Sequence, residues 1–119
     1  MVKHVEELDV FKLSHSLCKR IYNVTKKFPP EERFGLISQM RRSAYSIPMN
    51  LIEGSYRLNR KEFRQFVGIA RGSAGEMIYQ LLLSRDLEYI SDEEYTFFKG
   101  DYERVAKMLT KLASSLKEN

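Results

Sequence analysis

The chain has 119 residues, a length that accommodates one domain with one hydrophobic core. Charged residues make up 30% and hydrophobic residues 43%, a balance typical of globular rather than disordered proteins. No apolar run approaches the roughly 20 residues that span a bilayer, the N-terminus lacks the apolar segment of a secretory signal, and the single cysteine, Cys18, cannot form an internal disulfide. We therefore expect a cytoplasmic protein with one domain over residues 1–119.

The net charge of +4 is unevenly distributed along the chain. Between positions 33 and 85 there are nine basic and three acidic residues, so this segment carries +6 and the remainder carries −2. Eight of the nine are arginine, whose planar guanidinium makes forked contacts with phosphate or carboxylate.

Apolar spacing predicts a first helix from about Asp9 to Lys27. Its apolar residues recur at alternating steps of four and three, which places them on one stripe. Pro29 and Pro30 should end the helix, because the residue before a proline is driven out of the helical conformation. The expected core positions are Val10, Ser14, Leu17, Ile21, Val24 and Phe28, with Phe11, Cys18 and Tyr22 widening the stripe.

A second helix is expected to begin at Pro30, because proline suits an early helical position and acidic residues follow near the positive end of the helix dipole. It should end near Gly54. Pro48 removes one backbone hydrogen bond inside it, so we expect a kink without a break. The expected core positions are Ile37, Met40, Ala44, Ile47 and Leu51. A polar line away from the core is either an exposed face or a seam against another helix or subunit, and consists of Gln39, Arg42, Ser46, Asn50 and Glu53.

Capping residues mark the starts of two further helices. Asn59 is the expected N-cap of the third helix, which should end around Tyr89, and Ser91 with Glu94 has the capping-box spacing for the fourth. Short connections between long helices favour antiparallel neighbours, so the predicted fold is all-α, an antiparallel up-down-up-down four-helix bundle. The expected core positions are Phe63, Phe66, Ala70, Ala74, Met77 and Leu81, then Tyr95, Phe98, Tyr102, Val105, Leu109, Leu112 and Leu116.

The third helix carries a second face roughly opposite its core stripe. Three glycines within eight residues cost about 2–3 kcal/mol relative to alanine, so some packing should offset them. That packing is either a close crossing inside the bundle or a contact between subunits, and the second is favoured because packing residues on opposite sides of a helix require partners on both. This glycine face consists of Gly68, Gly72, Gly75, Tyr79 and Leu82.

Basic side chains form another line on or just before the third helix, between the core stripe and the glycine face. A solvated basic edge is the ordinary explanation for such a line. The alternative is a strip that contacts an anion or the RNA backbone, and the arginine bias and the lack of interleaved acids favour it. Both explanations stay open at this point. This basic strip consists of Arg57, Arg60, Lys61, Arg64 and Arg71.

No catalytic, metal-binding or cofactor-binding constellation stands out in the sequence. The two histidines, His4 and His15, are eleven residues apart, and a serine nucleophile would lack an obvious base. There is no Glu-x-x-His pair of the di-iron bundles and no Gly-x-x-x-x-Gly-Lys phosphate loop. Cys18 flanks the core stripe and is expected to be a small buried hydrophobe. We therefore expect no enzymatic activity, no metal and no cofactor.

Two motifs resemble the signature of the "four helix bundle protein" family, small proteins often encoded within intervening sequences of bacterial large-subunit rRNA genes. The pattern Leu-x-x-Gln-hydrophobic-Arg-Arg and then Ser-Ile-Pro-x-Asn-Ile-x-Glu-Gly covers residues 36–54, with Leu51 replacing isoleucine. A later Ala-x-Gly-Ser covers residues 70–73, and the similarity extends over nearly the whole chain. We interpret the matching positions as structural or interface positions, and they are Gln39, Arg41, Arg42, Ser46, Pro48, Asn50, Glu53 and Gly54.

The resemblance implies a bundle that assembles into a homopentameric ring. It also relates the chain to the accessory variability proteins of diversity-generating retroelements, which work with a reverse transcriptase and RNA through a basic surface. For the rRNA-encoded members it implies no biochemical activity. We therefore expect a non-enzymatic, self-associating adaptor that binds RNA or a nucleic-acid-handling protein. The alternative is a scaffold for a protein partner, with no role in nucleic-acid binding.

Overall fold

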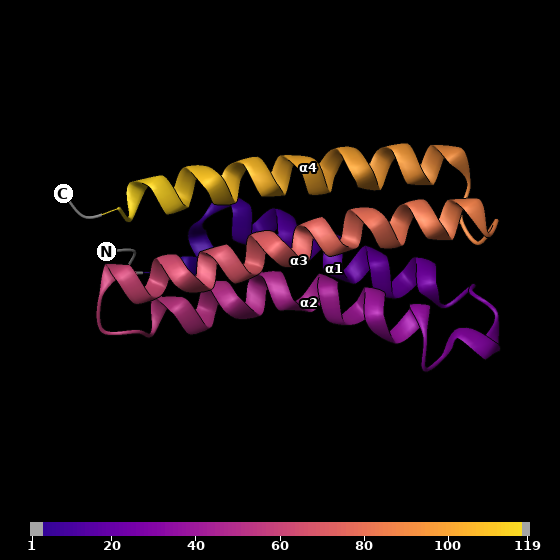
Figure 1. The fold of residues 1–119 in the computed structure, drawn as a ribbon, viewed down its shortest axis with the longest axis horizontal. Coiled ribbons are helices and arrows are strands. Elements are labelled where there is room, and N and C mark those ends of the chain that lie inside the picture. The colour runs from indigo at the N-terminus through magenta and orange to yellow at the C-terminus, as the bar shows by residue number, and fades with distance from the viewer. Residues whose placement is uncertain (1–3, 118–119) are drawn as a thin grey trace.

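Four long helices run along a common axis in the computed structural model, which describes residues 4–117 (Figure 1). The start of α1 and the end of α4 lie at the same end of a molecule measuring 47 × 24 × 20 Å. The predicted all-α up-down-up-down bundle is therefore confirmed. The elements are η1 (Val5–Glu7), α1 (Asp9–Thr25), η2 (Pro30–Glu32), α2 (Leu36–Ser55), α3 (Arg60–Asp86) and α4 (Asp92–Ser115).

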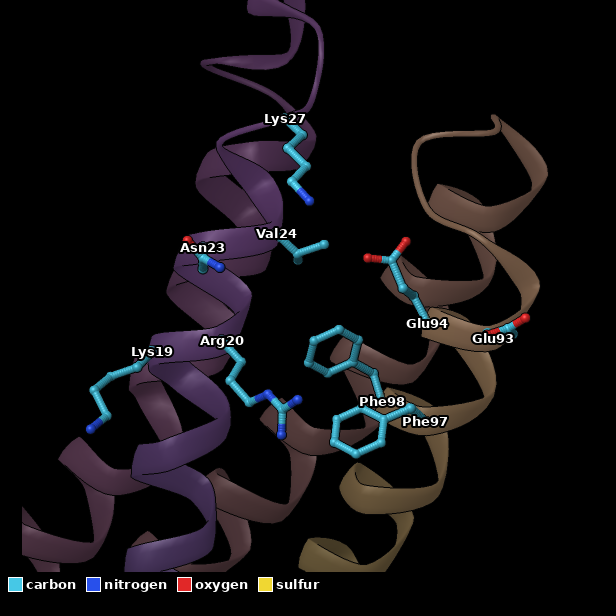
Figure 2. Close-up of a pocket in the computed structure, with 9 residues that line it drawn as sticks. All are labelled: Lys19, Arg20, Asn23, Val24, Lys27, Glu93, Glu94, Phe97 and Phe98. Carbon is cyan, nitrogen blue, oxygen red and sulfur yellow. The ribbon is translucent and has the colours of Figure 1, made fainter.

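Helix α3 packs against α2 on one side and α4 on the other, and α1 packs against α2. The bundle closes less tightly between α1 and α4 than between the other adjacent long helices. A groove remains there, between the second half of α1 and the first turns of α4 (Figure 2). Within the described chain no helix is long and apolar enough to cross a membrane.

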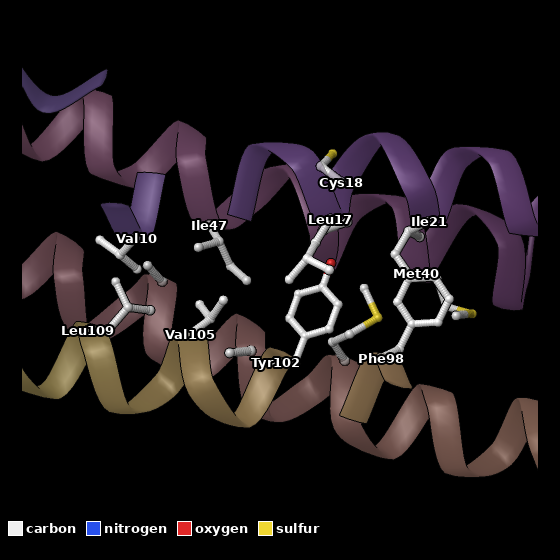
Figure 3. Close-up of a cluster of buried hydrophobic side chains, with 14 of the residues drawn as sticks. Val10, Leu17, Cys18, Ile21, Met40, Ile47, Phe98, Tyr102, Val105 and Leu109 are labelled. Carbon is white, nitrogen blue, oxygen red and sulfur yellow. The ribbon is translucent and has the colours of Figure 1, made fainter. Parts of the chain in front are cut away.

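The predicted core stripes meet in the centre of the bundle, as Figure 3 shows for part of it. All six expected core positions of the first predicted helix are buried, including Phe28, which lies just beyond the end of α1. Ile37 of α2 and Tyr95 and Leu112 of α4 are half-buried at the margin of the core. The remaining stripe positions of these two helices are buried, namely Met40, Ala44, Ile47, Leu51, Phe98, Tyr102, Val105, Leu109 and Leu116.

One core position of α3 differs from the prediction. Phe66 is half-buried beside α2, whereas Val67 and Ser73 are buried in its place. α3 packs against both α2 and α4, so its buried face is wider than the single stripe that we predicted and includes Val67 and Ser73. In α1, two of the residues expected to widen the core stripe are not fully buried, because Tyr22 is exposed and Phe11 is half-buried.

Three helix boundaries also differ. α1 ends at Thr25 rather than Lys27, ahead of the extended residue Pro29. The second helix does not begin at Pro30, because η2 is a separate turn and the backbone leaves the helical conformation at Gly35, with φ −110° and ψ −112°. α3 ends at Asp86 rather than Tyr89, where Glu88 adopts a positive φ of 64° that cannot continue a helix.

The predicted helix starts are confirmed for α3 and α4. The Asn59 side chain accepts the backbone N–H of Glu62 at 2.8 Å. Ser91 and Glu94 form a complete capping box, with reciprocal hydrogen bonds of 3.0 and 2.9 Å. α2 also continues through Pro48 without a break, as predicted. The kink at Pro48 stays a prediction.

Candidate nucleic-acid interface and contacts of the motif residues

Three arginines of the basic strip extend from α3 to the C-terminal part of α4. Nε of Arg64 donates to the carbonyl oxygen of Ala113 at 3.1 Å, and Nη2 of Arg60 donates to that of Ser115 at 3.2 Å. Nε of Arg71 donates to the hydroxyl of Thr110 at 2.8 Å. The three therefore line one long edge of the bundle between α3 and α4.

The acceptors include the carbonyl groups of Ala113 and Ser115 in the last turn of α4, where carbonyl groups lack the regular backbone partner four residues on. The carbonyl of Ala113 also accepts the backbone N–H of Leu116 at 3.2 Å. α4 has no basic residue in its own last turn to balance the negative end of its dipole. Arg60 and Arg64 supply that positive charge from the neighbouring helix. This contribution to stability was not foreseen from the sequence, because it depends on how α3 and α4 are aligned.

The strip nevertheless stays positively charged and accessible. Arg60, Arg64 and Arg71 are all exposed, and none has a carboxylate within 4 Å among residues 4–117. A guanidinium has five N–H donors, and each of these three uses one in the hydrogen bonds above. The remaining donors can therefore bind an anion.

The other two members of the predicted strip lie apart from these three. Arg57 precedes α3, pairs with Glu53 at 3.5 Å and lies over the ring of Phe66 at 4.6 Å. Lys61 is exposed on the same side of α3 as Gly68 and Gly72, by the 100° step per residue. The structure thus brings three of the five predicted residues together.

The glycine face of α3 points away from the rest of the chain. A Cβ built at Gly68, Gly72 or Gly75 would have no atom within 4 Å. The explanation that these glycines allow a close helix crossing inside the bundle is therefore wrong. Tyr79 on the same face is 62% exposed, and Leu82 is half-buried. Contact between subunits, the favoured alternative, stays a prediction.

The motif residues Ser46 and Asn50 form a buried polar seam between α2 and α3. The hydroxyls of Ser46 and Ser73 lie 2.9 Å apart, and Nδ2 of Asn50 donates to the carbonyl and hydroxyl oxygens of Ser46 at 2.7 and 3.0 Å. Ser73 belongs to the second motif, so the two motifs meet in space. The predicted polar line of α2 is thus divided. Gln39, Arg42 and Glu53 are exposed, and only Ser46 and Asn50 form a seam against another helix.

Gly54 and Arg41 also have structural contacts. A Cβ at Gly54 would lie 2.8 Å from Cδ1 of Phe63, so glycine allows α2 and α3 to approach closely. Nε of Arg41 donates to the hydroxyl of Thr25 at 2.9 Å, and its Nη2 donates to the carbonyl of Tyr22 at 3.3 Å. The motif residues that make these contacts therefore join the first three helices.

Two comparisons with known proteins give matches. A family model described as 23S rRNA-intervening sequence protein matches residues 6–111. The chain belongs to this family. A crystal structure of a protein of unknown function from the S23 ribosomal protein family of Bacteroides thetaiotaomicron has a similar fold, with a TM-score of 0.80 and 28% identity over 88% of this chain and 95% of that chain. No curated protein matches.

This member of the intervening-sequence family also exposes an apolar stripe on α2 that the sequence analysis missed. Its four side chains are between 37% and 82% exposed and recur at steps of four, three and four, on the side opposite the core. The same periodicity rule could have found it, but it was applied only to the core. The stripe consists of Tyr45, Met49, Ile52 and the C-cap residue Tyr56.

The titratable groups with shifted pKa values in this family member are held in their neutral forms. Burial raises the pKa of the Cys18 thiol and of the Tyr102 phenol. A hydrogen bond of 2.9 Å to Glu32 raises the pKa of Tyr89. A thiol with a raised pKa is a poor nucleophile. Over residues 4–117 no three His, Cys, Asp or Glu side chains gather as a metal site would require.

Proposed function

We propose that this protein is a non-enzymatic, self-associating adaptor that binds the RNA backbone through Arg60, Arg64 and Arg71. The observation that carries the proposal is the row of three exposed guanidinium groups without carboxylate partners along the described edge of α3. Arg60 and Arg71 are eleven residues apart, about 16 Å along the helix. A strip of that length can contact more than one phosphate of a single strand.

The hydrogen bonds to α4 favour this role. They hold the flexible arginine side chains in place, which lowers the conformational entropy lost when an anion binds. Only some of the donors are used, and the rest are available for phosphate oxygens. Contacts of this kind recognise backbone rather than bases, so we expect little sequence preference.

Self-association would strengthen such binding. Three arginines in one subunit bind weakly, but an assembly repeats the strip, and linked contacts gain affinity through effective concentration. The glycine face of α3 is the surface we propose for the contact between subunits. A homopentameric ring, and a reverse transcriptase or another nucleic-acid-handling protein as an additional partner, are proposals that rest on the family resemblance.

The test is binding of single-stranded RNA as a function of salt. Three phosphate contacts give a log–log salt slope of roughly −2, and an assembly should give a steeper one. The double variant Arg60→Gln/Arg64→Gln should weaken binding to every sequence by roughly tenfold or more, because two phosphate contacts are lost. Circular dichroism and sedimentation establish that the variant is folded and assembled.

The matched control is Lys12→Gln/Lys26→Gln, which removes the same charge from an exposed position of α1 and from its exposed C-cap. It should change RNA affinity much less than the strip variant. An equal loss in both double variants, or no RNA binding by the native protein at low salt, would show that the strip is not an RNA site.

A protein scaffold is the second candidate, favoured by the exposed stripe Tyr45, Met49, Ile52 and Tyr56. Aromatic and methionine side chains are enriched at protein interfaces. Binding through this stripe would depend little on salt, unlike binding to phosphate. The scaffold would be favoured if Met49→Ser abolished binding of a protein partner and if that binding depended little on salt in the native protein.

A further inference from the structure

A second set of basic residues lies on α4, beside the three arginines of α3. Residues 104–117 contain four basic and no acidic residues. Three of the four recur at steps of three and four on the solvent-facing side of the helix, and all three are exposed. We call them the outer row, which consists of Arg104, Lys107 and Lys111.

Thr110 lies between the arginines of α3 and the outer row. Its hydroxyl accepts Nε–H of Arg71 at 2.8 Å, so the arginines reach the flank of α4. By the 100° step per residue, Lys107 lies about 60° and Lys111 about 100° around α4 from Thr110. A helix with its side chains is roughly 10–12 Å across. The outer row therefore runs alongside the arginines within about one helix diameter.

Neither row is paired with acidic side chains. Among residues 4–117, no member of the outer row and none of the three arginines has a carboxylate within 4 Å. The acid that precedes the outer row, Glu103, is paired with Lys99 at 3.1 Å. Glu62 in the first turn of α3 lies about 160° around that helix from the arginines at positions 60 and 64. The two rows thus present positive charge on one continuous surface.

This surface has no exposed aromatic ring. Residues 104–117 contain no aromatic residue, and residues 60–72 contain only Phe63 and Phe66. Phe63 is fully buried, and Phe66 is half-buried, with the guanidinium of Arg57 over its ring at 4.6 Å. Proteins that bind single strands stack the bases on aromatic side chains. A surface with cations alone suits a nucleic acid whose bases are already stacked inside a duplex.

We propose that this surface binds double-helical RNA, with the two rows contacting the phosphates of the two strands. The major groove of A-form RNA is deep and narrow, so the two backbones approach each other across it. The arginines of α3 contact one backbone and the outer row contacts the other. This inference rests on the proposed binding of the RNA backbone and specifies which form of RNA is bound.

The test compares a short RNA duplex, one of its strands alone and the DNA duplex of the same sequence, by fluorescence anisotropy at low salt. We expect the RNA duplex to bind most tightly. The DNA duplex should bind more weakly, because its major groove is about 12 Å wide and holds the two backbones farther apart.

The decisive variant is Lys107→Gln/Lys111→Gln, which removes two cations of the outer row and leaves the arginines of α3 in place. It should weaken binding of the RNA duplex by roughly tenfold and lower the log–log salt slope by about 2, because two phosphate contacts are lost. Binding of the single strand should change little. Circular dichroism establishes that the variant is folded.

Two further double variants serve as references. Arg60→Gln/Arg64→Gln should weaken binding of both RNAs, because its arginines contact a backbone in either case. Lys12→Gln/Lys26→Gln removes an equal charge from exposed residues at α1 and should change neither binding reaction appreciably.

The outcomes separate this inference from the proposed RNA binding. If neither RNA binds at low salt, both are overturned. If the single strand binds as tightly as the duplex, or if Lys107→Gln/Lys111→Gln weakens both equally, only the duplex inference is overturned. The same holds if that variant leaves duplex binding unchanged, or if the DNA duplex binds as tightly as the RNA duplex.

Discussion

Gly54 and Gly100 both lie inside helices, where glycine is a poor helix former, but their surroundings differ. A Cβ at Gly54 would lie 2.8 Å from both Cδ1 of Phe63 and Cβ of Phe66. At Gly100 it would have no atom within 4 Å. Gly54 is therefore required by the approach of α2 to α3, whereas Gly100 only lowers helix propensity.

The first prediction compares alanine at these two positions. Gly54→Ala should lower the free energy of unfolding by about 1–3 kcal/mol, because the bundle must shift to admit the methyl group. Gly100→Ala should raise it by about 0.5–1 kcal/mol through helix propensity. Urea denaturation measures both, and a stabilising effect of Gly54→Ala would contradict the close approach.

Tyr102 is fully buried, and its hydroxyl has no hydrogen-bond partner among residues 4–117. Burial raises the pKa of its phenol, with a further contribution from Cys18. The folded protein therefore retains the phenolic proton at a pH where the unfolded chain, with a pKa of about 10, loses it. Stability from this group is complete below that pH and falls as the pH rises above it.

The second prediction concerns Tyr102→Phe. At neutral pH the free energy of unfolding should be unchanged or higher by about 1 kcal/mol, because no hydrogen bond is lost and an unpaired polar group is removed. Above pH ~10 the variant should lose less stability than the native protein. Urea denaturation across that pH range measures both effects, and a destabilised variant at pH 7 would indicate a partner for the hydroxyl.

At the scale of the elements, two helices receive a positive charge at their C-terminal end from a neighbour. α1 and α4 both lack a basic residue in the last turn. Arg41 of α2 donates to the carbonyl of Tyr22 in α1, and Arg60 and Arg64 of α3 donate to carbonyls of α4. The terminal carbonyls and the negative end of each dipole are thus stabilised through tertiary contacts.

The third prediction compares Arg64→Gln with Lys61→Gln, which removes an equal charge from an exposed position one turn earlier. Arg64→Gln should lower the free energy of unfolding by about 1 kcal/mol. It should also speed hydrogen exchange of the amides at residues 112–117, because the end of α4 loses a cap. Lys61→Gln should do neither, and equal effects of the two substitutions would rule out capping by Arg64.

At the scale of the whole molecule, the α2–α3 hairpin leaves two faces without partners in the described chain. One is the glycine face of α3, and the other is the stripe formed by Tyr45, Met49, Ile52 and Tyr56 on α2. Small residues allow helices from different chains to approach closely, and exposed aromatic residues are typical of interfaces. The first face is where we expect subunits to meet.

The fourth prediction is that Gly72→Leu yields smaller species than the native protein in sedimentation velocity. A Cβ built there has no atom within 4 Å in the described chain, so we expect the fold to be retained while close approach of a second subunit is blocked. Gly100→Leu is the control, because that position is equally open but lies on α4. A monomeric native protein, or a similar shift in both variants, would rule out the glycine face as an interface.

The sequence by itself determined the four helices, most of their core positions and the caps at Asn59 and Ser91. These features depend on local periodicity and on hydrogen bonds between residues three positions apart, so one chain segment contains the whole signal. The motifs at residues 36–54 and 70–73 likewise sufficed to indicate the family, which the family model confirms. They did not explain why Ser46, Asn50 or Gly54 are needed.

Only the tertiary structure decided what those residues and the basic strip contact. Ser46 meets Ser73 across 27 positions, and Arg64 meets Ala113 across 49, so no local pattern predicts either contact. The structure also separated Arg57 and Lys61 from the three arginines beside α4, and it showed that the glycines of α3 face open space. Helical spacing predicts which residues share a face, but the alignment of neighbouring helices decides what that face meets.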